Sequence, residues 1–164
     1  MANAILTQEH LKELFNYDPG TGNLVRLVRT SSNANIGDIV GYKNTNGHLQ
    51  VRINGKYLLV HRVIWLYMNG SWPLCQIDHV NGVRTDNRLK NLREVSSAEN
   101  SQNRRNAHSN NITGLLGVSP HGKNYQTAIL ANGKRKYIGT FKTPELAHEA
   151  YLKAKRELHS SCTI

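Results

Sequence analysis

Hydrophobic positions near the N-terminus follow a helical spacing. Leu11, Leu14 and Phe15 lie three and four residues apart, and Thr7 before them can cap a helix N-terminus. The turn-forming run 18–22 follows and is expected to end this helix. The chain is therefore predicted to open with a short helix.

The next part of the chain consists of short β-prone segments, from Leu24 to Val60. Asn46-Gly47 and Asn54-Gly55 split these segments, and such pairs favour hairpin turns because both positions tolerate positive φ. This pattern predicts a small antiparallel sheet. The stretch 61–68 is then apolar on most sides and stops before Asn69-Gly70, as a buried helix does.

The C-terminal part combines strand and helix patterns. Segments 124–131 and 135–141 flank Asn132-Gly133, which predicts a hairpin with a type I′ turn. Thr143 and Pro144 then suit the start of an amphipathic helix that runs toward His159. Alternation along the first strand directs one set of side chains toward the helix: Tyr125, Thr127 and Ile129. The other set is expected on the outer face: Gln126, Ala128 and Leu130.

These elements predict an α+β protein built of small modules. The expected modules are an N-terminal helix with a small antiparallel β-sheet over 1–60, a central core over 61–105, an Asn-rich linker over 106–115, and a three-stranded sheet packed on one helix over 116–164. A chain of 164 residues is long enough for one ordinary domain or two very small ones.

Composition points to a polyanionic partner. The formal net charge is +10, from 21 Lys and Arg against 11 Asp and Glu, so nucleic acid is the first candidate. Cys75 and Cys162 form no Cys-x-x-Cys pair, so neither a disulfide framework nor a zinc knuckle is expected. No apolar run has the length of a membrane helix, and a cytoplasmic protein without a membrane partner is expected.

Candidate chemistry is concentrated between residues 77 and 105. Asp78 offers a hard oxygen to a divalent cation, and the neighbouring His79 can accept a proton from water. Adjacent residues on a strand point to opposite faces, so both can serve one site only if the strand ends or bends there. Asn91 lies in the intervening loop, where its amide can hold the backbone by hydrogen bonds.

A helix start is expected just downstream. The run Ser96-Ser97-Ala98-Glu99 has the form of a capping box, which places Asn100 on the first turn of the helix. The amide oxygen of Asn100 can complete the ligation of the cation, and Arg104 and Arg105 are expected to extend a positive field along the helix. Asn87 and His61 are further candidates for an accessory role; turn formation is the alternative for Asn87, and capping or packing for His61.

Several motifs together resemble the HNH endonucleases of the phage and group I intron homing type. They are Asp78-His79-Val80-Asn81-Gly82, Asp86-Asn87-Arg88-Leu89, Asn91-Leu92-Arg93 and Glu99-Asn100, preceded by His61-Arg62 and Trp72-Pro73. The resemblance implies a ββα-metal fold, with His79 as general base, Asp78 and Asn100 as metal ligands, and Asn91 orienting the base. The other histidines, His10, His48, His108, His148 and His159, match no pattern and receive no function.

Residues 114–159 resemble a second family, the plant ethylene-response-factor DNA-binding domain. The resemblance rests on Gly117-Val118, Asn132-Gly133, the run 137–141 and the run 147–151. It implies a three-stranded sheet that contacts DNA with its exposed face, through Arg135 and Tyr137 above all. His121, Lys123 and Gln126 are added as contacts, although His121 stands where that family has an arginine; a merely solvated basic hairpin is the alternative.

The sequence therefore predicts a metal-dependent endonuclease that nicks or cuts double-stranded DNA and leaves 5′-phosphate and 3′-hydroxyl ends. One divalent ion is expected, Mg²⁺ first, with Mn²⁺ or another divalent ion as alternatives. A monomer or homodimer without another protein partner is expected, in the bacterial host of a phage. The alternatives are a non-catalytic DNA-binding protein that keeps the HNH scaffold, and a nonspecific nuclease.

Overall fold

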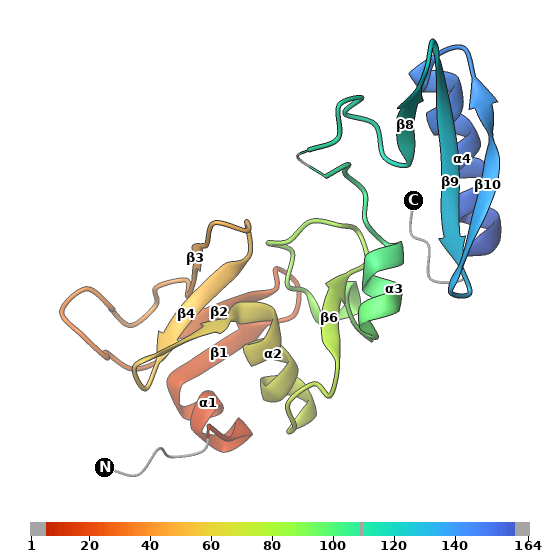
Figure 1. Ribbon diagram of the computed structural model, residues 1–164. Coiled ribbons are helices and arrows are strands. Elements are labelled where there is room, and N and C mark those ends of the chain that lie inside the picture. The colour runs from red at the N-terminus through yellow and green to blue at the C-terminus, as the bar shows by residue number, and fades with distance from the viewer. Residues whose placement is uncertain (1–5, 109, 160–164) are drawn as a thin grey trace. The chain divides into compact units, whose positions relative to one another are not determined.

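The computed structural model describes residues 6–108 and 110–159, and it combines helices with several small antiparallel sheets (Figure 1). This agrees with the predicted α+β class. The chain divides into two compact units, Met1–Ser97 and Ala98–Ile164. No helix in the described part of the chain combines the length and apolar character that crossing a membrane requires.

The described part of the first unit contains three small sheets and two α-helices. The helices are α1 (Gln8–Leu14) and α2 (Val60–Asn69). The strands are β1 (Phe15–Asp18) and β2 (Asn23–Arg26), which pair with each other; β3 (Tyr42–Lys43), β4 (Leu49–Ile53) and β5 (Lys56–Leu59), in the order β3-β4-β5; and β6 (Gln76–His79) with β7 (Leu92–Val95), preceded by the short 3₁₀ helix η1 (Leu89–Asn91).

The N-terminal helix forms as predicted, but its end differs. Thr7 caps α1 by accepting a hydrogen bond from the backbone N–H of His10. The helix ends at Leu14, and the chain continues directly into β1. The predicted helix terminator at 18–22 is wrong in this role, because it forms the turn between β1 and β2. Phe15 and Tyr17 alternate into the core, which favours a strand over a further helical turn.

Helix α2 lies at the centre of the first unit. Its inner residues Val60, Val63 and Ile64 are at most 1% exposed, and Gly70 ends the helix in the left-handed conformation. The same core cluster takes in Leu66 of α2, Val40 from the segment before β3, and residues from α1, β1, β2, β4, β6 and β7: Leu11, Phe15, Tyr17, Leu24, Val51, Ile53, Ile77 and Leu92. The N-terminal elements and the β6–β7 pair therefore share one hydrophobic core, across the predicted boundary at residue 60.

The second unit contains a three-stranded sheet and a long helix. After α3 (Ser97–Gln102), its strands are β8 (Val118–His121), β9 (Asn124–Ala131) and β10 (Lys134–Phe141), in the order β10-β9-β8, and α4 (Pro144–Leu158) packs on the sheet (Figure 1). The β9–β10 turn has positive φ at Asn132 and Gly133, as a type I′ turn requires. Thr127 and Ile129 are buried and Leu130 is 62% exposed, which confirms the predicted faces.

One expectation about the segment after β7 is wrong. Helix α3 starts at Ser97, as the capping box predicted, but it ends at Gln102. Arg104 and Arg105 therefore lie beyond the helix and do not extend along it. The division between the two units falls before α3, ahead of the predicted linker 106–115. Cys75 is a free, exposed thiol, and Cys162 lies outside the described residues.

The irregular segment before β8 is held on α4 by specific contacts. The buried Lys155 ammonium donates to the carbonyl of Arg104 at 2.5 Å, and the His148 ring bonds the carbonyl of Leu116 at 2.8 Å. Gly117 has φ +78, and a Cβ there would lie 2.2 Å from the ring of Tyr151. Only glycine allows the chain to pass this close to the ring.

We expect Gly117→Ala to destabilise the second unit more than Gly133→Ala. Both positions have left-handed φ, which costs an Ala about 1 kcal/mol, but a Cβ on Gly133 meets nothing within 4 Å. Overpacking against Tyr151 should add about 1–3 kcal/mol for Gly117→Ala. Urea unfolding monitored by hydrogen exchange of β9 amides measures the difference, and equal losses would contradict this packing.

Candidate functional site

The β6–β7 pair separates Asp78 and His79 onto opposite faces. Ile77 and His79 are buried on the inner face, whereas Asp78 lies across from Arg93 on the outer face. His79 is the last residue of β6, and the chain turns there, with the N–H of Gly82 donating to the carbonyl of His79 at 2.8 Å. The bend expected next to the Asp-His pair is therefore present.

A buried amide orients the His79 ring. Nε2 of His79 lies 2.9 Å from Oδ1 of Asn87, and both residues are at most 4% exposed. Because an amide oxygen can only accept, this contact assigns the proton to Nε2 and leaves the lone pair of the neutral ring on Nδ1. The imidazole is thus prepared as a proton acceptor at Nδ1.

Two further histidines pack around His79. His61 of α2 and His48, which precedes β4, have ring centroids 5.1 and 5.6 Å from that of His79. Burial, followed by the neighbouring His79 and His48, lowers the pKa of His61 to about 3, and burial also lowers the pKa of His48. His61, a predicted accessory residue, lies beside the candidate base. His48, to which the sequence pattern assigned no function, lies there too.

Asn91 holds the loop that follows His79. Its side-chain oxygen accepts from the N–H of Asn81 at 2.9 Å, and its side-chain nitrogen donates to the carbonyl of Asp86 at 2.8 Å. Its backbone carbonyl accepts from the N–H of Val80. The hydrogen bond of the His79 ring is to Asn87, and Asn91 acts on the ring through this loop.

The N-terminal hairpin supports the same loop from outside the motif. The hydroxyl of Tyr17 donates to the carbonyl of Asn87 at 3.1 Å and accepts from the N–H of Leu89 at 2.8 Å. Gly22, with φ +79, lies against the same backbone, because a Cβ there would be 2.4 Å from the nitrogen of Arg88. The position of Asn87 therefore depends on residues about 70 positions earlier in the chain.

An ion pair stiffens the middle of the loop. The Arg88 guanidinium bonds both carboxylate oxygens of Asp86, and Asn81 donates to the same carboxylate at 2.6 Å. The bond from Arg88, with that from Asn81, holds the pKa of Asp86 well below its usual range. Asp86 thus has a structural position, and Asn87, which the sequence could also assign to a turn, faces the site.

The two predicted metal ligands lie in different units. Asp78 is held by Arg93, whose Nη2 and Nε lie 2.9 and 3.1 Å from Oδ2 of the carboxylate. Asn100 lies on α3, within Ala98–Ile164. Their joint ligation of one ion stays a prediction.

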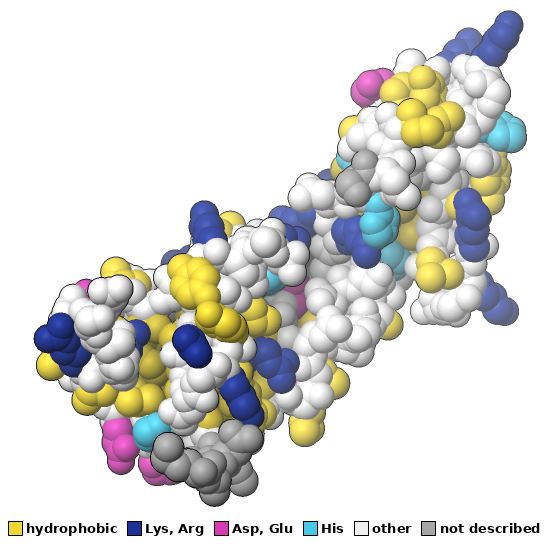
Figure 2. Space-filling model, turned by 60° about the vertical axis from the view of Figure 1, so that its left-hand side comes forward, with side chains coloured by type: hydrophobic (Ala, Val, Ile, Leu, Met, Phe, Trp, Pro, Cys, Tyr) yellow, Lys and Arg dark blue, Asp and Glu magenta, His cyan; other side chains and the backbone are white. Residues whose placement is uncertain are grey.

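The predicted DNA contacts lie mainly on the open face of the second unit. Arg135 and Tyr137 on β10 are exposed, Tyr137 to 61%, and α4 covers the other face of the sheet. His121 and Lys123 are exposed at the β8–β9 turn and Gln126 is partly exposed on β9. Lys and Arg side chains are spread over the visible face of each unit, with few acidic groups (Figure 2).

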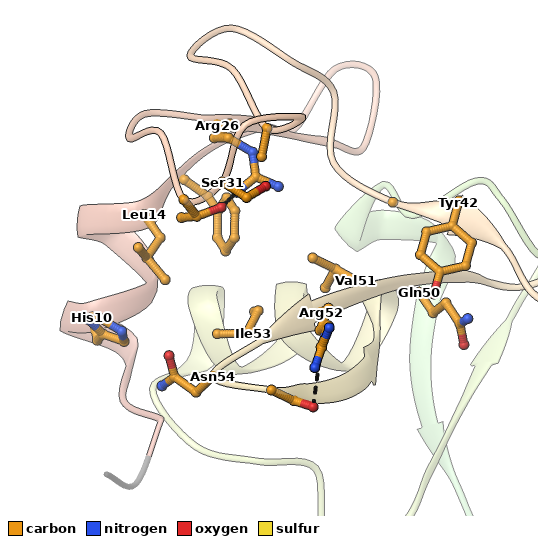
Figure 3. A pocket seen from close by; sticks show the side chains of 15 residues that line it. His10, Leu14, Arg26, Ser31, Tyr42, Gln50, Val51, Arg52, Ile53 and Asn54 are labelled. Carbon is orange, nitrogen blue, oxygen red and sulfur yellow. Dashed lines mark hydrogen bonds between the residues drawn. The ribbon is translucent and has the colours of Figure 1, made fainter. Parts of the chain in front are cut away.

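A cavity of about 590 Å³ lies elsewhere in the first unit, between α1, the β1–β2 hairpin and β4. Apolar and polar side chains both line it, among them Leu14, Val51 and Ile53 and Arg26, Tyr42 and Arg52 (Figure 3). It includes none of the three clustered histidines. The aromatic rings of Tyr42 and Tyr57 meet edge to face on the exposed sheet, next to Arg52, a surface that the sequence pattern did not indicate.

Residues 58–102 match a family model described as HNH endonuclease. The central segment is therefore similar to HNH endonucleases. This match covers β6, β7 and η1, together with the histidines at 61 and 79, and it supports a nuclease with DNA as substrate. No curated protein and no solved structure matches the chain.

We expect Tyr17→Phe to loosen the loop 80–91, because the substitution leaves the carbonyl of Asn87 and the N–H of Leu89 without their shared partner. The loss should be about 1–3 kcal/mol in unfolding free energy, with faster hydrogen exchange at Leu89. Tyr67→Phe is the matched control, since that hydroxyl bonds none of the described residues. Identical exchange rates at Leu89 in both variants would refute the support from Tyr17.

Proposed function

We propose that this protein is a metal-dependent DNA endonuclease of the HNH homing type. The observation that carries the proposal is the His79 ring, which lies inside the matched segment and is oriented by Asn87 so that Nδ1 keeps its lone pair. Hydrolysis of a phosphodiester needs a group that takes a proton from the attacking water. His79 is the proposed general base.

Asn87, Asn91 and Tyr17 position that base. General-base catalysis requires the accepting nitrogen to stay within hydrogen-bond reach of the water, so the ring must not rotate. Asn87 fixes the ring at Nε2, Asn91 fixes the loop backbone, and Tyr17 holds the backbone of Asn87. Each contact restricts one freedom of His79.

The proposed metal ligands are Asp78 and Asn100. A carboxylate and an amide oxygen are ligand types that Mg²⁺ accepts, so the donor set fits one divalent cation, Mg²⁺ first. The bound ion would supply positive charge for the phosphate and the departing 3′ oxygen. Arg93 holds the Asp78 carboxylate in place and adds a positive charge beside it.

The second unit is the proposed DNA reader. Its sheet resembles the plant ethylene-response-factor type: it has three strands, helix α4 covers one face, and the other face is exposed and carries Arg135 and Tyr137. A guanidinium can bond phosphate or guanine, and an aromatic ring can pack on a sugar or a thymine methyl. We propose that this face lengthens the contact with double-stranded DNA and guides where the cut falls.

His79→Ala should slow cleavage by about 10²- to 10⁴-fold, because it removes the base. Plasmid relaxation with Mg²⁺ or Mn²⁺ measures it, with end analysis expected to give 5′-phosphate and 3′-hydroxyl termini. His10→Ala, on α1 outside the cluster, is the matched control. A fully active His79→Ala protein, or 3′-phosphate ends, would overturn the mechanism. A wild-type protein that binds DNA but does not cut it, whichever metal is added, would instead favour a DNA-binding protein with an HNH scaffold.

Arg135→Ala should weaken DNA binding by about 1–3 kcal/mol, and the salt dependence should become shallower if the lost partner is a phosphate. Lys153→Ala removes an exposed charge from α4, on the covered side of the sheet, and is the control. Fluorescence anisotropy with duplex DNA at several salt concentrations measures both. Equal effects of the two substitutions would indicate a diffuse charge effect instead of a contact face.

A further inference from the structure

Three histidines from separate parts of the first unit form a compact cluster. His48 precedes β4, His61 lies in α2, and His79 ends β6. The ring centroids of His48 and His61 are 5.1 Å apart, as are those of His61 and His79. One ring nitrogen from each can be chosen such that all three lie within 4.8 Å of one another.

The hydrogen bonds of this cluster are incomplete among the described residues. Nδ1 of His48 and Nδ1 of His61 are both buried and have no hydrogen-bond partner there. An unpaired buried polar atom is destabilising, and two of them on neighbouring rings point to a ligand that meets both. The Nε2–H of His79 already donates to the side-chain oxygen of Asn87. Metal-binding imidazoles commonly donate in this way from their second nitrogen.

We propose that His48, His61 and His79 bind one transition-metal cation of the Zn²⁺ class. Three imidazole nitrogens suit Zn²⁺, Co²⁺ or Ni²⁺, whereas Mg²⁺ prefers oxygen. Zn–N bonds of about 2.0–2.1 Å place tetrahedral ligand nitrogens roughly 3.3 Å apart, so the rings must approach by about 1.5 Å at most. Small side-chain rotations provide such a movement.

The backbone around His48 is already fixed for this role. Asn44 accepts from the N–H of His48 through its side-chain oxygen at 3.1 Å. Arg84, from the loop after His79, donates to the carbonyl of Asn46 at 2.6 Å. These bonds hold the His48 loop against the loop that follows β6, so binding requires little reordering.

The site has a consequence for cleavage, which rests on the proposed function. The Nδ1 lone pair of His79 can bind a metal or accept a proton, but not both at once. Zn²⁺ in the cluster would therefore block the general base and inhibit the cleavage that Mg²⁺ supports. The site itself does not depend on that activity.

Binding is tested on the full, metal-stripped chain with Co²⁺ as probe. We expect one Co²⁺ per chain with visible absorption typical of tetrahedral coordination, displaced by Zn²⁺. His48→Gln should weaken Co²⁺ binding more than about 100-fold, since changes outside the ligand shell alone cost about 10- to 100-fold. Asn87→Ala should fall within that smaller range, and His10→Ala should bind as the wild type does. Absent stoichiometric binding, or equal binding by folded His48→Gln, would overturn the site.

Inhibition is tested separately by adding Zn²⁺ to the Mg²⁺-supported reaction, with each variant normalised to its own uninhibited rate. The cleavage rate of the wild type should fall by a factor of about ten or more, while that of His48→Gln should stay unchanged at the same Zn²⁺ concentration. Zn²⁺ binding without any change in cleavage would overturn the inhibitory consequence. A protein that binds Co²⁺ through the cluster but never cuts DNA would support the site and refute the proposed function.

Discussion

The orientation of His79 depends on a loop that has almost no hydrophobic anchor. Residues 80–91 bury the side chains of Asn87 and Asn91, and both are amides. A loop of this kind can stay in one conformation only if its polar groups find partners within the fold. Asn91 supplies those partners to the backbone, and the side chain of Asn87 orients the imidazole by a hydrogen bond.

The HNH segment is completed by residues that precede it in the chain. Tyr17, Gly22 and His48 all lie before residue 58, yet each reaches the loop or the base. They are carried by a hairpin and a sheet that share the core of α2, so the hydrophobic packing of the first unit sets their positions. This explains why a family match limited to 58–102 does not define an independent folding unit.

The two faces of the β6–β7 pair provide different ligand chemistry. The outer face presents the Asp78 carboxylate beside Arg93, which suits hard cations and phosphate. The inner face presents imidazole nitrogens in a buried cluster, which suits softer cations. Because strand alternation separates the adjacent residues 78 and 79, one dipeptide contributes to both environments.

The sequence by itself determined the local elements: the capped α1, the helix after residue 60, the Asn-Gly hairpins and the covered and open faces of β9, because propensity, capping and alternation act over a few residues. It also indicated the HNH motif and His79. Tertiary structure alone decided that 18–22 joins strands, that α3 stops before Arg104, and that the hydrogen bond of the His79 ring is to Asn87. Likewise, His48 matches no motif, and the packing of β4 against α2 within the shared core brings it to His79. The contacts of His48 with His79 and of Tyr17 with Asn87 join residues about 30 and 70 positions apart, and no short-range pattern encodes them.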